Sequence, residues 1–212
     1  MEFDLTQTDA LLSTTRSVRR RLDLDRPVPR DVVLDCLRLA VQAPTGGNAQ
    51  GWRWMVVDER DRIEALAELY GRTGRGYLAG YARAEQTAQT ERVLDSATFL
   101  LDVLARVPMM VIPCIKGRLA DPAPLMAASF YGSILPAVWS FQLALRSRGL
   151  GSTFTTLHLA HEAEGAELLG IPDDVTQVAM LPVAYTVGTD FKPAERGPIE
   201  HVTHVNEWRR RP

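Results

Sequence analysis

The hydrophobic positions in the first quarter of the chain predict two helices. Residues 8–15 are typical of a short helix that opens at Thr8 or Asp9, since both residue types cap helix N-termini. A second helix is expected over 31–43 because apolar side chains recur there at helical spacing, at Val33, Leu37, Ala40 and Val41. Pro44 and the glycines after it end this helix, so a loop should follow.

The middle of the chain alternates between strand and helix patterns. Residues 52–58 alternate and are rich in β-forming side chains, which predicts the first strand, and 61–71 reads as a helix stopped by a glycine. Residues 71–90 show no period and are expected to form a mobile excursion. A further helix is predicted over 93–104, and the apolar run at 109–115 is typical of a central strand.

The segment 125–148 is apolar around most of its circumference, which predicts a helix buried in the core or between subunits. Pro136 should bend or break this helix. The remaining predicted elements are a short strand at 152–157, a helix at 162–169 and an apolar strand at 178–185.

These elements indicate the α+β class, because about four strands are visible and helices dominate. At 212 residues and 23.5 kDa, the chain is expected to form a single domain over residues 1–212. The 46% hydrophobic and 24% charged composition is that of an ordinary folded protein.

The charge balance argues against a nucleic-acid-binding role, since the net charge is -2 and the isoelectric point about 6.1. The N-terminus lacks the order of an export signal, and the longest apolar stretches are too short for a bilayer span. A cytoplasmic protein without membrane contact is therefore expected.

Several catalytic templates are missing from the sequence. No GxGxxG lies between a strand and a helix, and neither GxxxxGK[ST] nor GxSxG occurs. The two cysteines lie in apolar surroundings and are expected to be buried free thiols. Histidines are spaced three apart at 158 and 161 and at 201 and 204, but no further ligand completes a metal site.

Two polar stretches carry candidate chemistry. Four arginines occur within residues 16–21, and Arg16, Ser17 and Arg19 together match a phosphate monoester, although a solvated charge run is the alternative. The glycine turn of APTGGNAQGW presents Asn48 and Gln50, whose amides suit the edge of a heterocycle; a plain turn is the alternative.

Read in chain order, several motifs resemble those of the nitroreductase family of flavin mononucleotide (FMN) proteins. They are RSVRRRLD, PVP, APTGGNAQGWRWMVV, LRSRGLGSTFTT, LLGIP, MLPVAYTVG and FKPAERGPIEHVTHVNEW. The resemblance runs from about residue 14 to 208 and is weakest over 71–108. Each motif is modest, but their combination in this order is specific.

The resemblance implies a central, mostly antiparallel sheet wrapped by helices, in a homodimer with two FMN molecules at the interface and the long buried helix near it. Residues in the stretch 16–20 would hold the phosphate, ribityl chain and pyrimidine edge of FMN. The side-chain amides of Asn48 and Gln50 would reach the flavin bound mainly by the partner subunit. The threonines at 155 and 156 would line the ring, and Arg196 would complete the phosphate clamp. The implied cofactor-binding residues are Arg16, Ser17, Arg19, Arg20, Asn48, Gln50, Thr155, Thr156 and Arg196.

The sequence departs from the family pattern at two places. Ala194 stands where relatives often have a second basic residue before the last phosphate-binding arginine, and Glu195 adjoins that arginine. Lys192 is a candidate substitute. Relatives also commonly have proline where this chain has Gly51, which should loosen the turn.

The function implied is an FMN-dependent oxidoreductase that takes a hydride from NADH or NADPH and passes two electrons to a planar electrophile, such as a nitroaromatic or quinone, in a ping-pong cycle. This cycle needs no catalytic side chain. The alternatives are a protein that stores FMN without turnover, or a relative that dehalogenates, reduces an activated double bond or degrades flavin. Residues 71–108, with Tyr70, Tyr77 and Tyr81, are candidates for a lid that selects the oxidant; the alternative is that they merely cover the core.

Overall fold

The computed structural model describes residues 2–81, 87–120 and 123–212. The chain divides into two compact units. One contains the two ends of the chain, up to Thr15 and from Asp190, and the other contains Arg16–Thr189. Each unit is described by itself.

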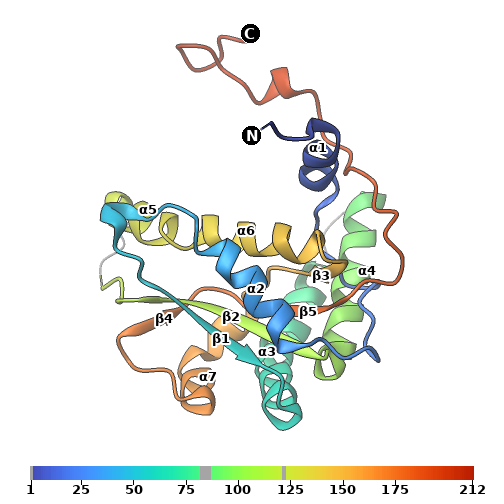
Figure 1. The fold of residues 1–212 in the computed structure, drawn as a ribbon, viewed down its shortest axis with the longest axis vertical. Coiled ribbons are helices and arrows are strands. Elements are labelled where there is room, and N and C mark those ends of the chain that lie inside the picture. Colours follow the sequence, from blue (N-terminus) through green and yellow to red (C-terminus); the bar gives the residue numbers. More distant parts are fainter. Residues whose placement is uncertain (1, 82–86, 121–122) are drawn as a thin grey trace. The chain divides into compact units, whose positions relative to one another are not determined.

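A five-stranded antiparallel sheet forms the centre of the unit Arg16–Thr189, as far as the described residues show (Figure 1). The strand order is β1-β2-β5-β3, and β4 also pairs with β2. The strands are β1 (Trp52–Val57), β2 (Met109–Lys116), β3 (Leu150–Ser152), β4 (Val175–Gln177) and β5 (Leu181–Tyr185). The predicted α+β class and antiparallel sheet are confirmed.

Pro113 lies inside the central strand β2, although proline cannot donate to a β ladder. On one side of β2, residues 109–111 pair with β5 and residues 114–116 pair with β4. Pro113 therefore lies where the neighbouring strand changes, and its carbonyl accepts from Val178 N–H at 2.9 Å.

Helices α2 (Arg30–Ala40) and α6 (Leu135–Arg146) pack on one face of the sheet (Figure 1). The buried side chains of α2 recur every three or four residues, which confirms the predicted amphipathic helix. They are Val33, Cys36, Leu37 and Ala40. They join residues of α6, β2 and β5 in one hydrophobic core.

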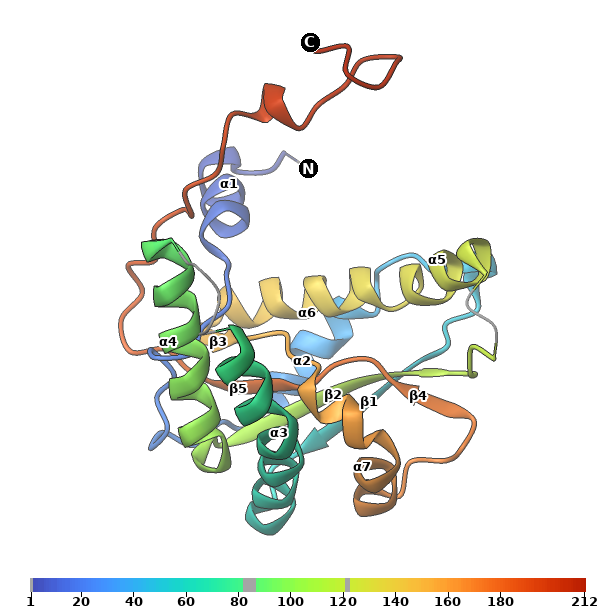
Figure 2. The same ribbon diagram turned by 180° about the vertical axis from the view of Figure 1, so that it is seen from behind.

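Helices α3 (Arg60–Tyr81), α4 (Ala88–Val103) and α7 (Glu162–Leu169) cover the opposite face (Figure 2). The prediction that a helix stops at Gly71 and that an irregular excursion follows is wrong, because α3 continues to Tyr81 and α4 begins at Ala88; residues 82–86 lie outside the described residues. Packing explains the difference: a Cβ on Gly74 would lie 2.6 Å from Leu101 of α4, so this glycine lets the two helices approach closely.

The predicted break in the segment 125–148 is confirmed. Helix α5 (Pro124–Gly132) ends before Ser133, and α6 starts with Pro136 in its first turn, where proline is tolerated.

Two predicted strands differ from the structure. The strand at 152–157 is wrong beyond Ser152, where β3 ends, although Thr155 still bridges Met180. Regular pairing at 178–185 begins only at Leu181. The helix predicted at 162–169 is confirmed as α7.

The other unit contains α1 (Leu5–Thr14) and a short 3₁₀ turn, Ile199–His201. The helix does not open at Thr8 or Asp9, because Asp4 caps it: its carboxylate accepts from Gln7 N–H at 3.1 Å. Within the described residues, none of the helices combines the length and apolar character that crossing a bilayer requires.

Candidate functional site

Residues 16–23, here called the basic segment, are attached to the edge of the sheet by their backbone. Val18 N–H donates to Ser152 O at 2.9 Å, and Asp23 N–H donates to Tyr185 O at 2.8 Å. Gly151 makes this approach possible, since a Cβ there would lie 2.9 Å from Val18 Cβ and 2.8 Å from Thr186 Cγ2. The segment is therefore fixed against β3 and β5.

The arginines of this segment have different surroundings. Arg16 and the hydroxyl-bearing Ser17 are exposed. Arg19 is half-buried, and burial lowers the pKa of its guanidinium, while the nearby Tyr70 acts in the opposite direction. Arg20 makes an ion pair with Asp95 at 2.7 Å.

An open cavity of about 290 Å³ lies beside Ser17. Its wall combines two aromatic side chains with aliphatic ones and one amide. The lining residues are Ser17, Leu135, Val138, Trp139, Gln142 and Phe154. Gln142 is buried and donates to Ser152 Oγ at 3.1 Å, so the amide is held in a fixed orientation.

Sequence reasoning did not single out the cavity residues Trp139, Gln142 and Phe154. The apolar circumference of the segment 125–148 was a signal for Trp139, which is 43% exposed in a helix whose other large apolar side chains are mostly buried. Phe154 lies within the motif STFTT but had no periodic signal.

Thr155 and Thr156 follow Phe154 directly. Thr155 is half-buried and exchanges two backbone hydrogen bonds with Met180, at 3.2 and 2.8 Å. Thr156 is exposed and precedes the 3₁₀ turn Leu157–His161. The threonines thus lie in the segment that also carries Ser152 and the cavity residue Phe154.

The turn at Thr45–Gln50 has an unusual backbone. Gly47, Asn48 and Gln50 have φ angles of 57°, 53° and 49°, which only glycine and asparagine adopt readily. The side chains of the last two bond to each other, Gln50 Nε2 to Asn48 Oδ1, at 3.0 Å. Two hydroxyls hold the turn: Gly46 N–H donates to Ser133 Oγ at 3.0 Å, and Gln50 N–H to Thr45 Oγ1 at 3.2 Å.

The structure does not bring all the predicted residues of this unit together. The turn at 45–50 is bonded to the break between α5 and α6, whereas the basic segment is bonded to β3, after the other end of α6 (Figures 1 and 2). Twelve helical residues separate these ends, which corresponds to about 18 Å. The turn and the basic segment therefore lie near opposite ends of α6.

Arg196 belongs to the unit formed by the chain ends. Its Nη1 donates to the carbonyl of Glu195 at 3.1 Å, and Ala194 is half-buried. A clamp that combines Arg196 with the basic segment, and the replacement of the missing cation by Lys192, remain predictions.

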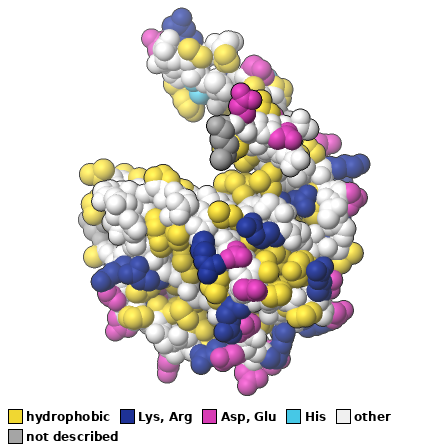
Figure 3. Space-filling model, viewed as in Figure 1, with side chains coloured by type: hydrophobic (Ala, Val, Ile, Leu, Met, Phe, Trp, Pro, Cys, Tyr) yellow, Lys and Arg dark blue, Asp and Glu magenta, His cyan; other side chains and the backbone are white. Residues whose placement is uncertain are grey.

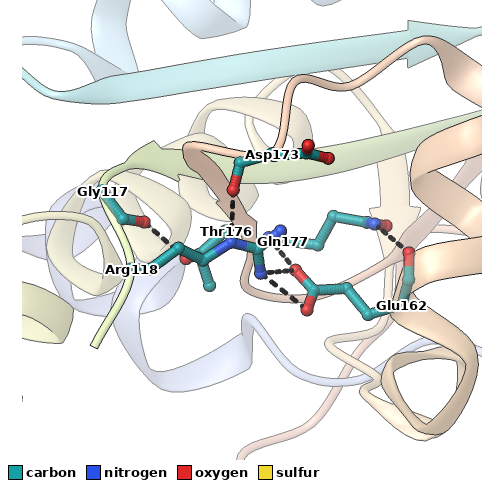
Figure 4. Close-up of polar contacts among 6 residues, drawn as sticks. All are labelled: Gly117, Arg118, Glu162, Asp173, Thr176 and Gln177. Atoms are coloured by element: carbon teal, nitrogen blue, oxygen red, sulfur yellow. Dashed lines mark hydrogen bonds and ion pairs between the residues drawn. The ribbon is translucent and has the colours of Figure 1, made fainter. Parts of the chain in front are cut away.

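A second polar cluster joins the end of β2 to α7 (Figure 4). Arg118 Nη1 donates to both carboxylate oxygens of Glu162 at 2.7 and 2.8 Å, and its Nε donates to Asp173 O at 2.8 Å. Glu162 also accepts from Gln177 N–H at 3.0 Å. These hydrogen bonds link the end of β2 to α7 and β4, while Gln177 Oε1 is buried without a partner among the described residues.

The histidines and cysteines have no place in the candidate site. Among the described residues, no three His, Cys, Asp or Glu side chains are grouped as metal ligands. Both cysteines are buried and free, as predicted. Burial is the main cause, and the negative charge of Glu162 a smaller one, that raises the pKa of Cys114 to about 12. His158 is buried and both its ring nitrogens lack a partner among the described residues.

Comparison with known proteins agrees with this fold. The iodotyrosine deiodinase of Thermotoga neapolitana is 27% identical over 181 residues, which cover 82% of this chain and 86% of that protein. The NADH dehydrogenase of Thermus thermophilus is 28% identical over 218 residues, covering 95% and 98%. The structure of the FMN and NADPH-dependent nitroreductase NfnB of Sphigopyxis sp. strain HMH matches 94% of this chain and 99% of its own, with a TM-score of 0.66 and 19% identity.

A model of the nitroreductase family matches residues 12–185, which include the basic segment, the glycine turn, the whole sheet and the cavity residues. The chain belongs to the nitroreductase family.

Proposed function

We propose that the protein is an FMN-dependent oxidoreductase that takes a hydride from NADH or NADPH and passes two electrons to a planar electrophile such as a nitroaromatic or a quinone. The observation that carries the proposal is the basic segment fixed against β3, with Ser17 in the wall of a cavity that Trp139 and Phe154 also line.

The residues present fit FMN. Arg16, Ser17 and Arg19 offer guanidinium and hydroxyl donors, which suit a phosphate. Arg19 pairs with no carboxylate among the described residues, so its charge is available to an anion. The aromatic wall of the cavity suits a flat ring, because offset aromatic rings attract.

When bound, FMN supplies the redox chemistry, and the protein holds and tunes it. Arg16 and Ser17 bind the phosphate, and Arg19 stabilises negative charge at the pyrimidine edge. Thr155 and Thr156 line the ring. Nicotinamide and oxidant use the same space in turn, which makes a ping-pong cycle the natural order.

A homodimer completes this site in our proposal. The turn that carries Asn48 and Gln50 is bonded to Ser133 before the start of α6, whereas the basic segment is bonded to β3, after the end of α6. In our proposal these two amides therefore reach the flavin of a second copy. Apolar side chains exposed on α5 and α6 support this contact, and hydrophobic surface is visible over these helices in Figure 3. They are Leu125, Met126, Tyr131, Leu135 and Trp139.

The experiment is an anaerobic titration of FMN-loaded protein. NADH or NADPH should bleach the flavin absorbance, and a nitroaromatic or quinone should restore it. Arg16→Ala and Arg19→Ala should each weaken FMN binding by about 1.5–3 kcal/mol, because each removes a charge-assisted contact. Arg38→Ala, which removes an exposed arginine on α2 that pairs with Asp35, is the control. Protein that binds no FMN contradicts the proposal, and flavin that no nicotinamide bleaches indicates storage instead.

Reductive dehalogenation is a second candidate, favoured by the likeness to the deiodinase of Thermotoga neapolitana. The same reduced protein, mixed with iodotyrosine, would then release iodide at a rate comparable to its rate with quinones. Absence of iodide release rejects this candidate and leaves the first.

A further inference from the structure

Two consecutive arginines of the basic segment contact the same face of α4. Arg20 donates to Asp95 Oδ2 from Nε at 3.1 Å and from Nη2 at 2.7 Å, and its Cζ lies 4.8 Å from the centre of the Phe99 ring. Arg19 Nη1 lies 3.4 Å from Ser96 Oγ. Positions 95 and 99 are one helical turn apart, so α4 presents a carboxylate and a ring to Arg20 together.

The two arginines differ in what neutralises them. The charge of Arg20 is met by a carboxylate and an aromatic face, the usual partners of a guanidinium. Among the described residues, the Arg19 guanidinium has a long contact to the Ser96 hydroxyl and an electrostatic interaction with Tyr70 but no carboxylate partner, although it is the more buried of the two. An incoming anion can therefore bind Arg19 without breaking an ion pair, whereas it would have to displace Asp95 from Arg20.

Helix α4 also forms part of the surroundings of Arg19. It packs against α3 at Gly74, and α3 carries Tyr70, whose phenol interacts electrostatically with Arg19. The position of α4 thus affects which side chains surround the Arg19 guanidinium, which we assign to the flavin edge.

We propose that Arg20 is a positioning residue rather than a cofactor ligand: through Asp95 and Phe99 it holds α4 against the basic segment and so shapes the oxidant site. The proposal rests on the proposed function. It separates the roles of two adjacent arginines, in that Arg19 binds the flavin and Arg20 orders the helix beside it.

The test compares Arg20→Ala, Asp95→Ala and the charge-reversed double variant Arg20→Asp with Asp95→Arg, with Arg19→Ala as the matched control. Four quantities are measured: hydrogen exchange of the α4 amides in FMN-free protein, the dissociation constant of FMN, and KM and kcat for a quinone.

Both single variants should accelerate α4 exchange and raise the quinone KM by about two- to tenfold, the range expected for an exposed ion pair with a cation–π contact. FMN affinity should stay within about twofold of the parent, and the double variant should restore both exchange and KM. Arg19→Ala should instead weaken FMN binding by about tenfold or more.

The proposal is overturned if Arg20→Ala weakens FMN binding as much as Arg19→Ala does while Asp95→Ala does not, since Arg20 would then be a cofactor ligand. It is also overturned if neither single variant changes α4 exchange. The exchange measurement needs no flavin, so failure of the parent protein to bind FMN would reject the proposed function and leave the contact between Arg20 and α4 to be judged separately.

Discussion

At the scale of single residues, the lack of a Cβ at Gly151 allows the basic segment to lie against β3. Any Cβ on Gly151 would collide with Val18 and Thr186. Val18 contacts it through Cβ, which cannot rotate away, so relief requires a backbone shift of the segment.

Gly151→Ala should therefore destabilise the protein by about 1–3 kcal/mol and weaken FMN binding. The matched control is Gly51→Ala, where the new Cβ would meet Ile115 Cγ1 at an ordinary 3.6 Å and φ is not left-handed. That change should stabilise by about 0.4–1 kcal/mol, because it restricts the unfolded chain. Urea unfolding measures the stability of each variant, and FMN titration measures its affinity for the cofactor. Equal stability of the two variants would contradict the close contact between Gly151 and Val18.

His158 predicts a pH dependence of stability. Burial lowers its pKa from 6.5 to about 4, and Glu162 opposes this only in part. Because the unfolded chain takes up the proton first, the contribution of His158 is fully present above pH 6.5. It is lost as the pH falls from 6.5 to about 4, by about 3 kcal/mol in total.

His158→Leu should remove this pH dependence, and should not destabilise at pH 7 because both ring nitrogens are buried without partners. Unfolding free energies at pH 7, 6 and 5 provide the measurement. A parent protein whose stability is flat over this range would disprove the interpretation.

At the scale of elements, glycines inside α3 have two different roles. Gly74 lies against Leu101 of α4, whereas a Cβ on Gly76 would meet nothing within 4 Å. Helix propensity alone favours alanine over glycine by about 1 kcal/mol at both positions.

Gly76→Ala should accordingly stabilise the protein by about 0.5–1 kcal/mol, and Gly74→Ala should gain less or lose stability, since Leu101 must move. Thermal unfolding of the two variants is the measurement. The order of the two melting temperatures is the decisive result, and the reverse order would show that α3 and α4 do not pack as described.

At the scale of the whole molecule, our proposal requires a second copy of the chain to complete the flavin site. Trp139 is 43% exposed on α6 and lines the cavity, so Trp139→Arg should disrupt both the dimer and the flavin site. Sedimentation should show a monomer with weakened FMN binding. Val93→Asp, which charges an apolar residue 45% exposed on α4, should leave the dimer intact. A monomeric parent that binds FMN fully would contradict the shared site.

The sequence by itself determined the elements whose hydrophobic period is complete within a short segment. The helix of α2, the strands β1 and β2, the helix α7 and the break before Pro136 were all predicted, because periodic burial is a local property of the chain. The order of seven motifs, which include the basic segment and the glycine turn, also indicated the family, but it did not show that these two segments lie near opposite ends of α6.

Features that depend on contacts between distant elements were decided only by the tertiary structure. Helix α3 continues through Gly71 because contact with α4 outweighs weak helix propensity. Arg20 meets Asp95, a residue 75 positions away, and the cavity takes Phe154 from a loop without any period. Sequence patterns report how each segment is buried, whereas these features depend on contacts between segments distant in the chain.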